Sequence, residues 1–232
     1  RSVNTGQAFS SRLSAFLQQH VSFDVQALSR ADSIPALVDA LQHSRYGMAL
    51  GNLVKSRETV TIFDFEMTLD ILNYKLLADG IQKQLKGTEQ KHMLTLVGSE
   101  ADMMNLMWIY RCKVNLKLPP ELVYSYIIPI YYHIRQGDIL KMANAQSPDE
   151  LFGLLRQTRY AALFAGGDFE TQYLQYFQTL CTRMLRGNPY SIAGIQCYMW
   201  LKEIEFRNII SIIESIRYGL EPDEIKSYLI VS

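Results

Sequence analysis

Apolar residues recur along most of this chain at the three- to four-residue spacing of an α-helix, and polar turns separate the runs. The longest run covers residues 66–85, where Leu69, Leu72 and Leu76 fall on one side of a helix. Shorter helices are expected before it, at residues 9–20, 23–30 and 34–49. A β-branched run at residues 59–63 is too short to indicate a sheet. The pattern therefore predicts an all-α fold.

The end of the chain resembles an earlier stretch. Residues 203–230 match residues 100–128, with Asn208 over Asn105 at an offset of 103 and the final positions at an offset of 102. Each stretch predicts a long helix, a stop, and a short helix opened by proline and acidic residues. In the first copy, Gly98-Ser99 could interrupt the long helix.

A second match lies upstream of the first. Residues 147–164 align with residues 33–50 at an offset of 114, and both contain an Arg-Tyr dipeptide, at Arg45 and Arg159. Ser147 begins the later copy as the first residue of a capping box, with proline next and glutamate three residues on.

Residues 168–170 repeat residues 64–66 at an offset of 104, so the offsets between the matched stretches fall from 114 through 104 and 103 to 102 along the chain. A duplication followed by a few deletions shifts in one direction in this way. The prediction is two tandem helical bundles of about 100 residues each, longer than the units of ordinary stacked repeats. The expected organisation is an N-terminal helical segment at residues 1–32, a first repeat at residues 33–146 and a second repeat at residues 147–232.

Each copy carries an acid three residues before its asparagine. On a helical wheel Glu205 lies near the centre of an apolar face, with Ile209 and Ile216 within about 40°. Asp102 takes the matching place beside Leu106. A carboxylate that faces a core must find hydrogen-bond donors or stay neutral.

Three interpretations of these acids stay open. One is a buried polar network that fixes helix packing, with Arg45, Arg159 or a free helix N-terminus as the donor. Another is a cavity or interface where the acid meets a partner's cation, and the third is catalysis.

Charge and composition restrict the classes of partner and the kinds of segment that the sequence indicates. Lys and Arg number 23, as do Asp and Glu, so neither nucleic acid nor simple adsorption to an anionic membrane is indicated. The three cysteines form no C-x-x-C pair and are expected to be reduced thiols. No apolar run approaches the roughly 18 residues of a spanning helix, and no signal peptide is expected.

The usual motifs of phosphate binding and nucleophilic catalysis do not occur in the sequence. Glu89 and His92 have the spacing of a di-iron motif, but such sites need two of these motifs and further glutamates. The sequence therefore predicts no catalytic residue, metal, cofactor or small-molecule substrate.

Several segments resemble a known family. Residues 198–209 followed by residues 219–225 are similar to the C-terminal signature of the C subunit of A-type and prokaryotic V-type rotary ATPases, whose eukaryotic equivalent is the d subunit. Residues 11–47 resemble the N-terminal region of that family, and residues 102–106 with residues 111–113 resemble its internal segment. The likeness covers nearly the whole chain.

The resemblance implies an all-helical funnel in the rotor. Its mouth would receive the central shaft and its base would sit on the membrane proteolipid ring, peripherally at the cytoplasmic face. The funnel would couple torque without catalysis. The family usually has three helical repeats in a longer chain, and two are counted here. The candidate structural or interface residues are Asp102, Asn105, Glu205, Asn208, Arg45 and Arg159.

Two other functions remain open beside a rotor subunit. The first is an all-helical scaffold or adaptor of the same fold that binds other proteins. The second is a helical-bundle enzyme with a dispersed site.

Overall fold

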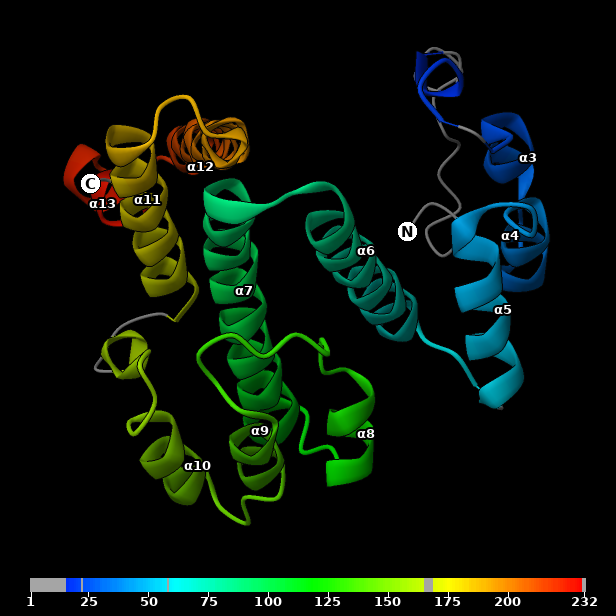
Figure 1. Cartoon of the computed structure of the whole chain (residues 1–232), viewed down its shortest axis with the longest axis horizontal. Helices are drawn as coiled ribbons and strands as arrows, with labels where there is room; N and C mark the ends of the chain where they lie inside the picture. The colour runs from blue at the N-terminus through cyan, green and yellow to red at the C-terminus, as the bar shows by residue number, and fades with distance from the viewer. Residues whose placement is uncertain (1–15, 22, 58, 165–168, 231–232) are drawn as a thin grey trace. The chain divides into compact units, whose positions relative to one another are not determined.

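The computed structural model describes residues 16–21, 23–57, 59–164 and 169–230 (Figure 1). Every regular element in these ranges is a helix, which confirms the all-α prediction. Most of the helix expected at residues 9–20 lies outside the described residues. None of the described helices combines the length and the apolar character that crossing a membrane requires.

The chain divides into two compact units, residues 1–75 and residues 76–232. The first unit contains α3 (Val25–Arg30), α4 (Ile34–Ala40), α5 (Arg45–Ser56) and most of α6 (Ile62–Gln84). Side chains of Asp24, Ser33 and Ser44 cap the first three helices, because each accepts hydrogen bonds from free main-chain N–H groups.

The sequence pattern predicts one helix where α4 and α5 stand. The chain turns at residues 41–44 instead, and the Ser44 hydroxyl caps the N–H groups of Tyr46 and Gly47. Gly47 lies so close to the Leu41 carbonyl that a Cβ atom there would overlap the carbonyl oxygen. The absence of a side chain at Gly47 therefore lets α5 pack against the turn at residues 41–44.

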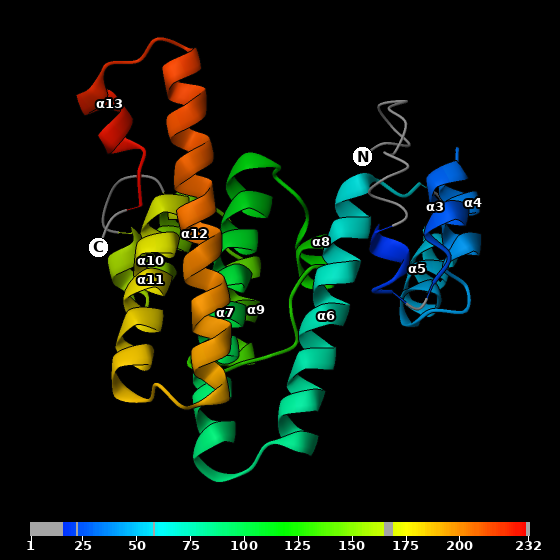
Figure 2. The ribbon, with the colours of Figure 1, turned by 90° about the horizontal axis from the view of Figure 1, so that it is seen from above.

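The second unit is built around α7 (Gly87–Tyr110), which continues as a π-helical turn at Arg111–Asn115. Its other helices are α8 (Pro120–Ser125), α9 (Gln136–Ala143), α10 (Pro148–Leu155), a 3₁₀ turn at Ala161–Phe164, α11 (Phe169–Gly187), α12 (Ile192–Arg217) and α13 (Pro222–Ser227). The helices α7, α11 and α12 pack against one another, and α9 packs against α7 (Figure 2).

The core of the second unit lies along α7, which is covered on several sides. Leu96, Met103 and Leu106 are completely buried. The break expected at Gly98 does not occur, and α7 runs through this residue. The ring of Tyr132 packs onto Gly98, 2.6 Å from the place a Cβ would occupy. Between α11 and α12 the ring of Phe177 stacks on Trp200 at 4.8 Å.

Local geometry recurs where the two matched stretches leave their long helices. Lys117 and Gly219 both have positive φ, 51° and 72°, the left-handed conformation that often ends a helix. The short helices α8 and α13 follow, each with proline in its first turn. These parallels support the predicted internal duplication. The duplication itself and the predicted domain boundaries stay predictions.

Candidate functional site

The two matched asparagines tie the end of each stretch to its long helix. Asn105 donates to the Ile128 carbonyl at 2.9 Å and accepts from the Ile128 N–H at 2.8 Å. Asn208 makes the same pair of bonds with Ile230, at 2.8 and 2.9 Å. Asn105 is buried and Asn208 half-buried. An amide that pairs with both main-chain groups of one residue fixes the position of that segment.

Asp102 organises the segment that follows Ile128. Its Oδ1 accepts from the Tyr132 N–H at 3.0 Å, and its Oδ2 accepts from the N–H groups of His133 at 2.6 Å and Ile134 at 3.3 Å. The Tyr160 hydroxyl also donates to Oδ2, at 3.2 Å. Asp102 is 1% exposed, and burial raises its pKa against the opposing effect of these bonds. The carboxyl thus joins α7 to the turn before α9 and to the end of the α10 region.

Neither arginine suggested as a donor supplies one of these bonds. Arg45 belongs to the first unit, where its guanidinium lies 5.6 Å from the centre of the Tyr46 ring. Arg159 is exposed near His133. Burial and then the Arg159 charge lower the pKa of His133. The donors to Asp102 are instead three successive main-chain groups and a tyrosine hydroxyl, so the arrangement is neither a salt bridge nor a helix N-terminus.

Glu205 differs from the expectation of a buried acid. Its side chain is 56% exposed and accepts from the Lys202 ammonium at 2.5 Å. Ile209 and Ile216, beside it on the helix, are 47% and 63% exposed. The sequence places these residues on one apolar face, but α12 buries its other side against α11. A role for Glu205 at an interface stays a prediction.

A third carboxylate, Glu89, considered from the sequence only as part of a di-iron motif, links the starts of α7 and α12. The Glu89 carboxylate accepts from the Ser191 hydroxyl and from the Ile192 N–H, both at 2.8 Å. These bonds lower the pKa of Glu89, the main-chain bond contributing most. His92 lies 3.3 Å from the same hydroxyl. Ser191 was recognisable as a helix cap, but its distant partner carries no sequence signal.

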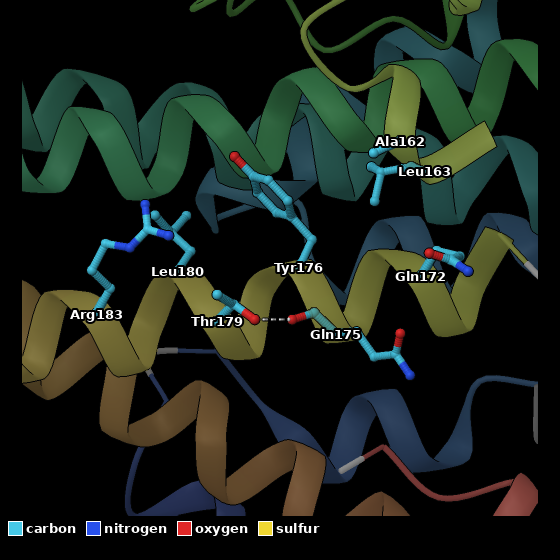
Figure 3. Close-up of a pocket in the computed structure, with 8 residues that line it drawn as sticks. All are labelled: Ala162, Leu163, Gln172, Gln175, Tyr176, Thr179, Leu180 and Arg183. Carbon is cyan, nitrogen blue, oxygen red and sulfur yellow. Dashed lines mark hydrogen bonds between the residues drawn. The ribbon is translucent and has the colours of Figure 1, made fainter. Parts of the chain in front are cut away.

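A pocket of about 280 Å³ lies along α11 (Figure 3). It is lined by Ala162, Leu163, Gln172, Gln175, Tyr176, Thr179, Leu180 and Arg183. These side chains offer amides, hydroxyls and one guanidinium, but no carboxylate, thiol or imidazole for acid–base or nucleophilic chemistry. Within the described ranges, no group of three or more His, Cys, Asp or Glu residues is placed to hold a metal ion.

The three cysteines are free and buried. Burial raises the pKa of the Cys112 thiol to about 11, so the thiolate that would act as a nucleophile is disfavoured. The polar groups described above hold main-chain segments of the second unit together.

Comparison with known proteins identifies the family. The family described as "ATP synthase (C/AC39) subunit" matches residues 1–228. The A-type ATP synthase C subunit of Methanosphaera stadtmanae is 24% identical over 221 residues, which cover 89% of this chain and 57% of the relative. The proteins of the same name from Haloferax volcanii and Thermococcus kodakarensis are 26% and 25% identical, and the matches cover 90% and 88% of this chain and 62% and 56% of those relatives.

This chain therefore spans less than two thirds of the length of these relatives. The match to the family nevertheless extends over nearly all of its residues. The chain belongs to the ATP synthase (C/AC39) subunit family.

Proposed function

We propose that this chain is a non-catalytic subunit of an A-type or V-type rotary ATPase, in which it connects the central shaft to the proteolipid ring. The observation that carries the proposal is the family match over residues 1–228, supported by relatives named as the C subunit of A-type ATP synthases. In this role the chain sits peripherally at the cytoplasmic face of the membrane.

A subunit that transmits torque has to resist deformation. The bonds of Asp102 and Asn105 suit this task, because they lock the turn before α9 and the end of the α8 segment onto α7. Each such bond contributes on the order of 1 kcal/mol net, and a bond to a charged group contributes more. The Glu89 bonds to Ser191 and Ile192 add a second connection, between α7 and α12.

An adaptor function outside a rotary motor is the second candidate. It is favoured by the exposed apolar side chains of α12, among them Phe206 and Ile213, since such surfaces mark protein interaction sites. An adaptor would keep the helical fold and bind other proteins.

Co-purification distinguishes the two functions. The tagged chain is recovered from native membranes solubilised in mild detergent, and its partners are identified by mass spectrometry. Recovery of ATPase head, shaft and proteolipid subunits in fixed proportion is the expected result. A chain without its tag controls for carry-over of membrane complexes. A stable complex that contains none of the ATPase subunits would contradict the rotary function and favour the adaptor.

A further inference from the structure

Three sulfur-containing side chains meet where α11 packs against α12 (Figure 2). Cys181 and Met184 lie three residues apart on one side of α11, and Cys197 lies on α12. The Cys197 Sγ atom is 3.7 Å from the Met184 Sδ atom, and the Cys181 and Cys197 thiols are hydrogen-bonded to each other. The two cysteines are 1% and 0% exposed. These three residues, called the sulfur cluster below, therefore lie together in the core of the second unit.

The packing of α11 against α12 holds the sulfur cluster in place. On one side of it, the rings of Phe177 and Trp200 stack at 4.8 Å. On the other side, Leu185 packs against Gly194, where an added Cβ would lie 3.5 Å from the leucine Cδ2 atom. The two thiols lie between these contacts, three or four residues from each along their helices. The register of the two helices therefore keeps the thiols facing each other.

The separation of the sulfur atoms suits a shared metal ion. Metal–sulfur bonds are about 2.3 Å long, so two ligand sulfurs on one ion lie about 3.8 Å apart in a tetrahedral site and about 4.0 Å apart in a trigonal one. The 3.7 Å between the sulfurs of Cys197 and Met184 is close to both values. The side chains therefore need little movement to share an ion.

The chemistry of these ligands indicates which ion. Zn²⁺ sites use thiolate, imidazole and carboxylate ligands, usually four of them, whereas thiolates with a thioether are the soft ligands that select Cu(I). The hydrogen bond from Cys181 lowers the pKa of Cys197, which favours the thiolate that binds a metal. The same bond, with burial, raises the pKa of Cys181, so this thiol is expected to lose its proton only when the metal binds.

We propose that the sulfur cluster binds one Cu(I) ion, with Cys181 and Cys197 as thiolate ligands and Met184 as the thioether ligand. Binding releases the two thiol protons to solvent. Met184 is half-buried, so the ion enters past its side chain. The bound ion ties α11 to α12. The proposal does not depend on the rotary function.

The test titrates the reduced whole chain with Cu(I) in the absence of oxygen, in competition with a coloured Cu(I) chelator. Native mass spectrometry counts the ions on each chain, and thermal unfolding is followed by circular dichroism with and without Cu(I). Met184→Leu keeps an apolar side chain of similar size and removes only the thioether. Cys112→Ser is the matched control, because Cys112 is also a free, buried thiol but lies in the π-helical turn after α7.

The expected result is one Cu(I) ion per chain, bound equally by Cys112→Ser and at least tenfold more weakly by Met184→Leu. Cu(I) should also raise the Tm of the wild-type chain, because the assembled site exists only in the folded state. Met184→Leu keeps the test decisive even where a cysteine substitution unfolds the chain.

Three results would overturn the proposal. The first is failure of the chain to take any Cu(I) from the chelator. The second is equal affinity in the wild type and Met184→Leu, since ordinary core packing would then explain the cluster. The third is a lower Tm with Cu(I), or loss of binding in Cys112→Ser, because the ion would then be held by thiols outside the proposed site.

Discussion

Removal of the Asp102 side chain is expected to destabilise the second unit by about 3 kcal/mol. Asp102→Ala deletes the acceptor of three main-chain N–H groups and of the Tyr160 hydroxyl. The consequences differ among these donors because their exposure differs. Ile134 is 3% exposed, so its N–H stays buried without an acceptor, which costs about 1–3 kcal/mol.

Loss of the carboxylate costs less free energy at the other three donors. Tyr132 and His133 are exposed, and water can replace the carboxylate there. Tyr160 is buried, but Ser99 still offers its hydroxyl a partner. The lost bonds to these three groups add about 1 kcal/mol, which gives the total above.

Urea unfolding followed by tryptophan fluorescence measures this change. The two tryptophans of the chain, Trp108 on α7 and Trp200 on α12, both lie in the second unit and report its unfolding selectively. Glu205→Ala is the matched control, because it removes the corresponding exposed acid and should change stability by less than about 1 kcal/mol. An Asp102→Ala chain as stable as this control would refute the reasoning.

Further predictions use the same assay. Burial raises the pKa of the Asp102 carboxyl group, so this group binds a proton more tightly in the folded chain than in the unfolded chain. The contribution of this protonation to folding stability is therefore full below about pH 4 and falls as the pH rises through the pKa of the folded state. The difference in unfolding free energy between wild type and Asp102→Ala should accordingly be larger at about pH 4 than at about pH 7. Asn105→Ala should lower the unfolding free energy by about 2–4 kcal/mol, because Asn105 is buried. Asn208 is half-buried, so Asn208→Ala should lower it by only about 1 kcal/mol, and equal losses would contradict this ranking. Gly98→Ala should cost about 1–3 kcal/mol, because its Cβ would lie 2.6 Å from a tyrosine ring, whereas Gly80→Ala meets no atom within 4 Å and should cause no loss.

The sequence was sufficient for much of the fold. The capping box that begins at Ser147 marked a helix start, because the serine hydroxyl accepts a hydrogen bond from a free N–H group of the first turn. The alignment of the two copies also placed Asn105 over Asn208, and their bonds agree in partner and geometry. Each asparagine and its partner are only 22 or 23 residues apart, so both members of the contact lie within the matched stretch of each copy.

Contacts that depend on distant packing could not be predicted. Three of the donors to Asp102 are main-chain groups 30 to 32 residues away, which have no side-chain signal, and the fourth is a tyrosine hydroxyl 58 residues away. The wheel placed Glu205 on an apolar face correctly, but periodicity cannot tell which of two apolar faces the fold covers. The break expected at Gly98 failed for a related reason, because a tyrosine from a later turn fills the space beside it.

The proposed coupling role is tested most directly by measuring ATP hydrolysis and ion uptake together in native membrane vesicles depleted of this chain. The account predicts that ion uptake is lost while the ATPase heads still hydrolyse ATP, and that adding back the wild-type chain restores uptake. Vesicles that keep full ATP-driven ion uptake without the chain would contradict the account.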